Sequence, residues 1–248
     1  MRVKDAVDDF LVALEAENAS PATTKWYASI LMAFTRHFDG AALESVTAAQ
    51  VRLYLVGLRQ RDRYTGAPQR PKTVGAVGKA TLQAHDRALR GFWSWCAREY
   101  GLKGNPMDNV KKPRSDGLTP KAISLEDVAR LLAVCGDDPE GRRDKAIIAF
   151  LLDTGVRAQS VFKLEPAHLD MARRRAFVQE KGRPARPVFF TERTAALLES
   201  WLAVRPEKAA AVFCSLARHA FGARMTPTSL NRMLKRRAAA AGVEGPCN

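Results

Sequence analysis

The sequence predicts a mainly α-helical protein with one small β-hairpin or sheet, divided into two domains. Apolar residues recur at helical spacing along most of the 248 residues, and no strand pattern occurs in the first hundred. Two short β-type runs in the second half flank a turn containing Gly and Pro, which is typical of a hairpin. Residues 103–122 are rich in Pro, Gly and Lys, so we expect a basic linker there. The predicted domains are therefore residues 1–102 and 123–248, and 46% hydrophobic residues are enough for a core in each.

The first domain is predicted to be a small helical bundle. Apolar spacing predicts a first helix from Val3 to Leu14. The start signals of the next two helices are Ser20 followed by Pro21 and the Thr47/Gln50 capping box. Residues 59–73 are polar, basic and broken by Gly and Pro, so they predict a loop before a fourth helix. The aromatic residues of these helices are spaced as core rather than as a platform for stacking bases.

The formal net charge is +14, and it is unevenly distributed. Residues 1–44 hold 4 Lys and Arg against 7 Asp and Glu, whereas residues 45–102 hold 10 against 3. Residues 103–248 again have a basic excess, with 26 against 16. A basic excess in two successive regions suggests that a polyanion lies along much of the chain, and nucleic acid is the leading candidate. A generally basic surface without a bound polyanion is the alternative.

Basic residues on the fourth helix and in the loop before it are the candidates for phosphate contacts in the first domain. These residues are Lys72, Lys79, Arg87 and Arg90. In the linker, Lys111 and Lys112 either follow a nucleic-acid backbone or are simply solvated. Arg232 and Arg236 face outward on a last predicted helix over residues 226–241, which either lies in a groove of DNA or is an ordinary basic surface helix.

The stretch from Leu151 to Leu164 carries the main candidate site. An apolar helix runs into Gly155, which can adopt the positive φ that ends a helix, and a second short helix begins soon after it. Arg157 lies between the two helices, where the planar fork of its guanidinium can be aimed at a phosphate. The predicted hairpin tip is also strongly cationic, with Lys181, Arg183 and Arg186.

The four cysteines and four histidines are dispersed along the chain, without a CxxC pair. We therefore expect no cofactor and no structural metal. Reduced thiols of this kind are typical of a cytoplasmic protein. The sequence also shows no charged-apolar-small leader and no apolar run of membrane length, so we expect a soluble protein of the cytoplasm.

The order of these features resembles the tyrosine recombinase (phage integrase) family, over nearly the whole chain. Residues 72–95, followed by Asn105-Pro106, look like that family's helical (SAM-like) core-binding domain. TGVRAQSVFKLEPAHLD, with Arg157, looks like its first conserved arginine box. EKGRPARPVFF is similar to its β-hairpin segment, which puts Lys181 on the catalytic lysine and Arg186 on the second basic position. The resemblance implies a mixed α+β catalytic domain after the linker.

The resemblance also implies a mechanism. Tyrosine recombinases exchange strands of double-stranded DNA without a metal, through a covalent 3′-phosphotyrosyl intermediate. Arg157 would stabilise the negative charge that develops on the non-bridging oxygens, and Lys181 would protonate the departing 5′-oxygen. We therefore expect double-stranded DNA as the partner, and a homo-oligomer on DNA in the complete protein.

Two departures from the family pattern qualify this expectation. The position three residues after the arginine is usually acidic but is Ser160 here, so a supporting carboxylate is expected to be missing. The family's nucleophilic tyrosine cannot be placed, because the four tyrosines all precede the predicted catalytic domain, and the sequence ends about where the family's His-x-x-Arg box is expected to begin. We therefore expect a C-terminally truncated recombinase that binds DNA without cleaving it. The alternatives are a non-catalytic DNA-binding relic or regulator of the same fold, and a helical scaffold whose basic faces meet acidic partners.

Overall fold

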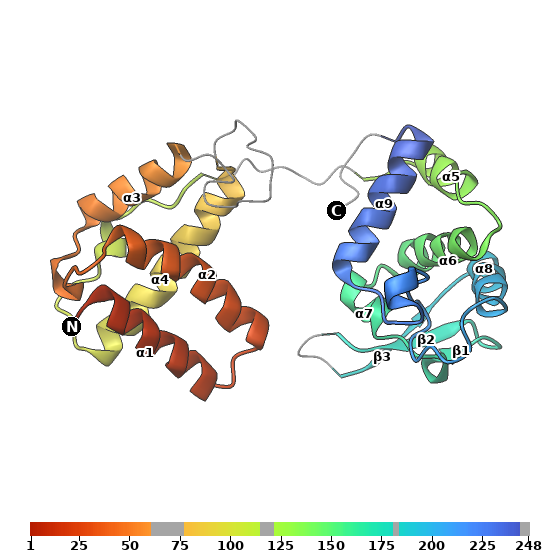
Figure 1. Ribbon diagram of the computed structural model, residues 1–248, viewed down its shortest axis with the longest axis horizontal. Helices are drawn as coiled ribbons and strands as arrows, with labels where there is room; N and C mark the ends of the chain where they lie inside the picture. Colours follow the sequence, from red (N-terminus) through yellow and green to blue (C-terminus); the bar gives the residue numbers. More distant parts are fainter. Residues whose placement is uncertain (61–76, 115–121, 181–183, 244–248) are drawn as a thin grey trace. The chain divides into compact units, whose positions relative to one another are not determined.

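The computed structural model describes residues 1–60, 77–114, 122–180 and 184–243. The chain forms two compact units, Met1–Leu118 and Thr119–Asn248, and each is considered by itself (Figure 1). The N-terminal unit is helical in the part described, and the C-terminal unit combines helices with a small antiparallel sheet. The prediction of a mainly α-helical protein with a small sheet is confirmed.

The described part of the N-terminal unit contains four α-helices and two short 3₁₀ helices. They are α1 (Val3–Ala16), α2 (Pro21–His37), η1 (Leu43–Ser45), α3 (Ala48–Gln60), α4 (Lys79–Glu99) and η2 (Pro106–Asn109). Both predicted helix-start signals are confirmed: Ser20 Oγ accepts the N–H of Thr23 at 3.2 Å. Gln50 Oε1 accepts the N–H of Thr47 at 2.8 Å, and Thr47 Oγ1 accepts the N–H of Gln50 at 3.3 Å. The loop predicted over residues 59–73 lies mostly outside the described residues.

The core of the N-terminal unit is aromatic, as its spacing predicts. Phe92 and Trp93 of α4 are at most 1% exposed, and the Phe10 ring meets Phe92 in an edge-on contact with centroids 5.7 Å apart. Met107 and Val110, which lie in the expected linker, are also buried in this core. The start of the segment expected to be a linker therefore folds onto α3 and α4 instead.

The C-terminal unit contains a three-stranded antiparallel sheet with order β1-β2-β3. Its elements are α5 (Leu125–Ala133), α6 (Pro139–Thr154), α7 (Ala158–Phe162), η3 (Pro166–His168), β1 (Leu169–Asp170), β2 (Arg175–Val178), β3 (Arg186–Phe189), α8 (Glu192–Leu202), η4 (Arg218–Ala220) and α9 (Pro227–Ala241). The β2–β3 hairpin was predicted, and its register pairs Val178 with Arg186. β1 was not predicted, because a strand of two residues carries no alternating pattern.

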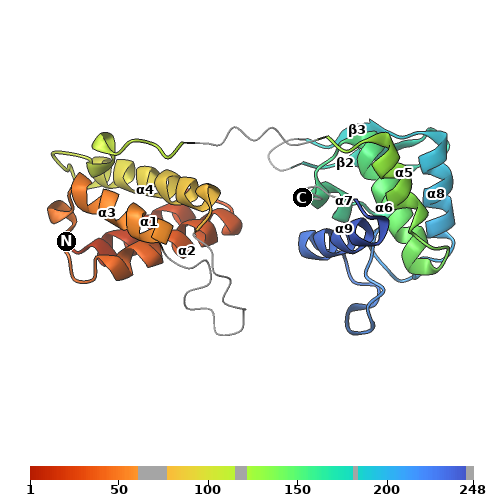
Figure 2. The ribbon, with the colours of Figure 1, turned by 90° about the horizontal axis from the view of Figure 1, so that it is seen from above.

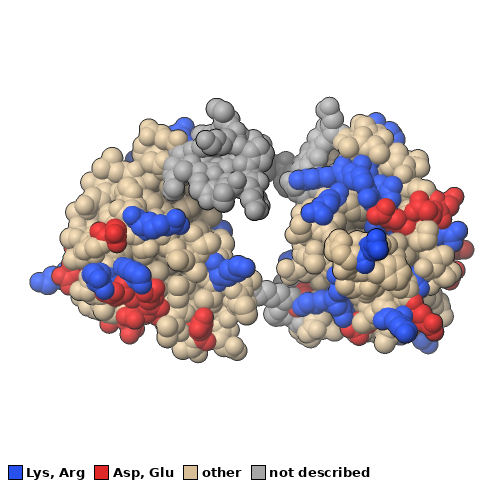
Figure 3. Space-filling model, in the orientation of Figure 1, with Lys and Arg blue, Asp and Glu red and all other residues tan. Residues whose placement is uncertain are grey.

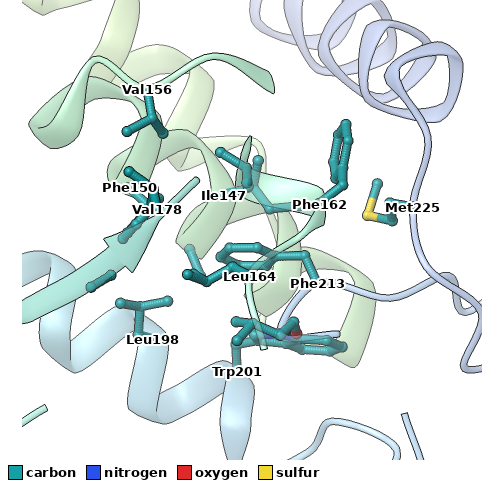
Figure 4. Close-up of a cluster of buried hydrophobic side chains, with 14 of the residues drawn as sticks. Ile147, Phe150, Val156, Phe162, Leu164, Val178, Leu198, Trp201, Phe213 and Met225 are labelled. Carbon is teal, nitrogen blue, oxygen red and sulfur yellow. Dashed lines mark hydrogen bonds between the residues drawn. The ribbon is translucent and has the colours of Figure 1, made fainter. Parts of the chain in front are cut away.

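The core of the C-terminal unit joins α6, α8 and the sheet (Figure 4). Phe150 of α6 and Trp201 of α8 are fully buried, and Val178 of β2 is 1% exposed. Trp201 Nε1 donates a hydrogen bond of 2.8 Å to the carbonyl of Val212, so the indole is buried without leaving its N–H unpaired. Because α6 and β2 share this core, the loop after α6 and the end of β2 are fixed relative to each other.

α9 is attached to α6 by a buried ion-pair network. The Asp144 carboxylate is fully buried, and Arg143 and Arg237 each place a guanidinium nitrogen 2.7 Å from one of its oxygens. Arg237 also donates to the carbonyl of Val134, which follows α5. In the second view α9 again lies beside the α5–α6 part of the unit (Figure 2). The network therefore fixes which face of α9 points outward.

Within the described ranges, no helix is long and apolar enough to cross a membrane. The same residues contain no group of three or more His, Cys, Asp or Glu side chains placed to hold a metal ion. Cys96, Cys135 and Cys214 are buried free thiols. Burial raises the pKa of Cys96 to about 12, so this thiol stays protonated and packs as a small apolar side chain.

Candidate functional site

Arg157 occupies the junction between two helices, as the sequence predicts. α6 ends at Gly155, which has a left-handed conformation with φ 60°, and its N–H bonds to the carbonyl of Leu151 at 3.0 Å. Val156 is buried, and Arg157 is the N-cap residue of α7. A buried residue before it and a helix after it hold the Arg157 backbone in place, while its side chain is 72% exposed.

The Arg157 guanidinium forms an ion pair with Glu180. Arg157 Nη1 lies 3.0 Å from Glu180 Oε1, and the Glu180 side chain is only 7% exposed. Arg186 Nε, at the start of β3, lies 3.7 Å from the other oxygen, Glu180 Oε2. The structure therefore brings together Arg157 and Arg186, two of the predicted site residues, through a carboxylate that sequence reasoning did not single out.

The expectation that a supporting carboxylate is missing is wrong. Glu180 supplies one from the residues just after β2, rather than from α7. Ser160 is buried on α7, and its hydroxyl donates a hydrogen bond of 3.1 Å to the carbonyl of Gln179. The serine thus attaches the segment carrying Glu180 to the helix that Arg157 begins. Ser160 is not acidic, but its hydrogen bond to Gln179 holds the adjacent Glu180 in place.

Three predicted site residues, Lys72, Lys181 and Arg183, lie outside the described residues. Lys181 directly follows Glu180 in the sequence, so one of its neighbours is fixed beside Arg157. Its proposed role as a proton donor remains a prediction.

Arg90 is not available for the phosphate contact expected of it. Its Nε bonds to Asp86 Oδ2 at 3.0 Å, and its Nη1 and Nη2 donate to the carbonyls of Met107 and Val110. The Arg90 side chain is 26% exposed. Its position on α4 faces the folded segment around η2, so all three guanidinium nitrogens are bonded to Asp86 or to backbone oxygens.

The other described candidates of the N-terminal unit lie on its surface. Lys79 and Arg87 of α4 are exposed, as are Lys111 and Lys112. The Arg87 guanidinium lies over the Trp26 ring, with its Cζ 5.1 Å from the ring centroid. This contact restrains Arg87 while leaving its charge at the surface. These four residues remain candidates for phosphate contact.

The two candidates on α9 differ from each other. Arg232 is exposed. Arg236 is half-exposed, and its Nη2 lies 2.9 Å from Glu140 Oε1 and 3.4 Å from Asp144 Oδ2. Basic side chains gather over α9 with acidic ones beside them (Figure 3). Part of the charge on this helix is therefore neutralised by α6, and Arg232 is the stronger candidate for a polyanion contact.

Comparison with known proteins identifies the family. Residues 121–248 match the model of the phage integrase family, which is slightly more than half of the chain. The chain belongs to the phage integrase family. Among curated relatives, it is 33% identical over 191 residues to tyrosine recombinase XerC 1 of Ralstonia nicotianae, covering 68% of this chain and 56% of that protein. It is 30% identical to tyrosine recombinase XerC of Shigella flexneri serotype 5b, over 80% of this chain and 63% of that protein.

Solved structures of an integrase and of a site-specific recombinase share the fold. A lambda integrase dimer bound to a COC′ core site matches with a TM-score of 0.74 at 13% identity, covering 98% of this chain and 65% of that one. The XerH site-specific recombinase bound to palindromic difH substrate matches with a TM-score of 0.70 at 19% identity, over 94% of this chain and 67% of that one. The chain thus has the tyrosine recombinase fold, and it spans less than two thirds of the length of the two curated relatives named above.

Proposed function

We propose that this chain binds double-stranded DNA and forms part of a site-specific tyrosine recombinase, an enzyme that breaks and rejoins DNA. The observation that carries the proposal is the placement of Arg157. It is an exposed guanidinium on a fixed backbone, with one nitrogen paired to a buried carboxylate. Curated relatives named tyrosine recombinases, and neighbours solved on a COC′ core site and a difH substrate, support the same function.

The site suits the charge of a phosphodiester. Arg157 and Arg186 carry two positive charges against the single negative charge of Glu180. The remaining charge matches one phosphate, and a guanidinium can donate two parallel hydrogen bonds to its oxygens. Negative charge that develops on those oxygens during attack is stabilised by donors already in place. Lys181 would protonate the leaving 5′-oxygen.

The tyrosine of this chemistry is not supplied by the C-terminal unit described. Tyr27, Tyr54 and Tyr100 belong to the N-terminal unit, and Tyr64 lies outside the described residues. In the proposed reaction, the tyrosine that forms the 3′-phosphotyrosyl bond is therefore not one of the described residues of the C-terminal unit. These residues by themselves supply DNA binding and two groups of the active site.

The N-terminal unit is proposed as the core-binding domain, over residues 1–102. Lys79 and Arg87 on α4 would contact phosphates, and so would Lys111 and Lys112, while residues 123–248 are proposed as the catalytic domain. We further propose that the complete protein acts as a homo-oligomer on DNA. Buried free thiols suit a reducing compartment, so the proposal places the protein in the cytoplasm.

Incubation of the 248-residue chain with nicked duplex suicide substrates tests this proposal. We expect a retarded complex in a native gel and no covalent adduct in a denaturing gel. An adduct that survives denaturation would contradict this expectation, because it would show that these residues supply a nucleophile themselves.

A non-catalytic DNA-binding protein of the same fold is the second candidate. The position of the tyrosines in the N-terminal part of the chain favours it, because DNA binding alone requires no nucleophilic tyrosine. The reading frame after Asn248 separates the two. A frame that continues into a His-x-x-Arg box and a tyrosine supports the recombinase, whereas a stop codon directly after Asn248 supports the binding protein.

A further inference from the structure

Glu180 is a buried carboxylate placed between two arginines of the candidate site. Its side chain is 7% exposed, with Arg157 Nη1 at 3.0 Å from one oxygen and Arg186 Nε at 3.7 Å from the other. A carboxylate removed from water needs such partners, because an unpaired buried charge is strongly unfavourable. Glu180 therefore has little freedom, and the arginine nitrogen facing it is restrained.

The backbone that carries Glu180 is itself attached to α7. Ser160 is 4% exposed, and its hydroxyl donates to the carbonyl of Gln179, the residue before Glu180. Arg157 begins the same helix, three residues earlier. α7 therefore contacts this segment twice, through the Arg157 side chain and through the Ser160 hydroxyl. The two contacts form a closed arrangement that fixes the carboxylate relative to the arginine.

We propose that Glu180 is the positioning residue for Arg157, and that Ser160 acts with it by anchoring Gln179. An arginine side chain that is 72% exposed would otherwise sample many rotamers, and that freedom would be lost on binding a phosphate. Pairing Nη1 with Glu180 restricts the side chain before DNA arrives. This inference rests on the proposed function, because the positioned guanidinium matters only where it meets a phosphate.

The arrangement also accounts for a small residue at position 160. An acidic side chain there would be buried close to Glu180, and two buried carboxylates so near each other repel. It would also remove the hydroxyl that anchors Gln179. An acidic residue at position 160 would therefore weaken the arrangement in which Glu180 pairs with Arg157.

The first test measures the Arg157 side chain directly, in the full 248-residue chain without DNA. In arginine-labelled protein, NMR reports rotation about the Nε–Cζ bond of each guanidinium, and an Arg157→Lys variant assigns the signal. We expect slow rotation for Arg157 in the wild type and averaged, fast-rotation signals in Glu180→Gln and in Ser160→Ala. Ser160→Ala changes no charge, so it separates positioning from electrostatics. Equally slow rotation in wild type and both variants would overturn the proposal, whether or not the chain binds DNA.

The second test is a double-mutant cycle of binding to a labelled duplex. Arg157→Ala should weaken binding by about tenfold in the wild type, as loss of one charge-assisted contact implies, and by less than about twofold in the Glu180→Gln background. Glu192→Gln is the matched control, since it removes an exposed carboxylate of the same unit that does not contact Arg157. An equal cost of Arg157→Ala in both backgrounds would overturn the proposal. No cost in either, with slow rotation retained in the wild type alone, would instead refute the phosphate role of Arg157.

Discussion

Arg90 and Asp86 lie one helical turn apart on α4, and Arg90 Nε meets Asp86 Oδ2 at 3.0 Å. The same guanidinium donates to the carbonyls of Met107 and Val110. A residue expected to contact DNA is therefore what attaches the segment around η2 to the helical bundle. Arg90 is thus a structural cation, whereas Lys79 and Arg87 of the same helix lie at the surface.

Arg90→Ala should destabilise the N-terminal unit. The substitution leaves Asp86, which is 5% exposed, without its positive partner and removes the donor to the Val110 carbonyl, whereas the Met107 carbonyl keeps the N–H of Val110. We expect a loss of roughly 2–4 kcal/mol in the free energy of unfolding, at the level found when a partly buried ion pair is broken. Urea denaturation measures it, with Arg87→Ala as the control. Equal midpoints for the two variants would show that Arg90 is not structural.

The Lys79→Ala/Arg87→Ala double variant should weaken DNA binding without unfolding the protein. Each lost phosphate contact lowers the salt dependence of log K by about 0.9, so we expect a decrease of roughly 1.8. Fluorescence anisotropy at several salt concentrations measures this slope. Arg98→Ala, an exposed cation in the last turn of α4, is the matched control. An unchanged slope in the double variant would remove this face of α4 from the interface.

Asp144→Asn should loosen α9 from α6. The fully buried carboxylate accepts from Arg143, Arg236 and Arg237, and neutralising it leaves three guanidinium groups without their shared negative partner. We expect a loss of about 3–5 kcal/mol in stability of the C-terminal unit. Hydrogen exchange measures this loss locally, as faster exchange of the α9 amides in the variant. The control is Glu140→Gln at a half-exposed position of the same network. Protection in α9 equal to wild type would contradict the prediction.

Stability should fall at low pH partly through Asp153, which joins the end of α6 to the start of α8. Burial opposes ionisation of this carboxyl, but the N–H and hydroxyl of Thr191, at 2.7 and 2.8 Å, hold its pKa below the ordinary value of 3.8. A lowered folded-state pKa gives a contribution that is complete above 3.8 and is lost as pH falls through the folded value. The Tm difference between wild type and Asp153→Asn should therefore shrink below about pH 4. A Tm difference between the two proteins that stays constant across this pH range would contradict the prediction.

Much of the fold followed from local patterns in the sequence. Apolar spacing predicted the principal helices, and Ser20 and Thr47 marked where two of them begin because capping depends on residues a few positions apart. The junction at Gly155 and Arg157 was predicted for the same reason: it depends on a positive φ that glycine adopts without strain.

The parts that sequence reasoning missed depend on contacts between distant segments. Arg90 was expected at the surface, since helical periodicity does not reveal that residues 106–110 fold back onto α4. Glu180 was overlooked because only the packed sheet brings the end of β2 beside α7. In both cases the overlooked contact, Arg90 with the Met107 carbonyl or Arg157 with Glu180, joins residues at least 17 positions apart in the sequence.

Titration of the 248-residue chain with duplex DNA at increasing salt tests the central claim most directly. If the exposed cations of both units contact phosphates, log K should fall linearly with log salt, with a slope of about −0.9 per phosphate. We predict a slope of roughly −4 or steeper for wild type, made shallower by about 0.9 in Arg157→Ala. Absence of binding at low salt, or a slope near zero, would contradict the account.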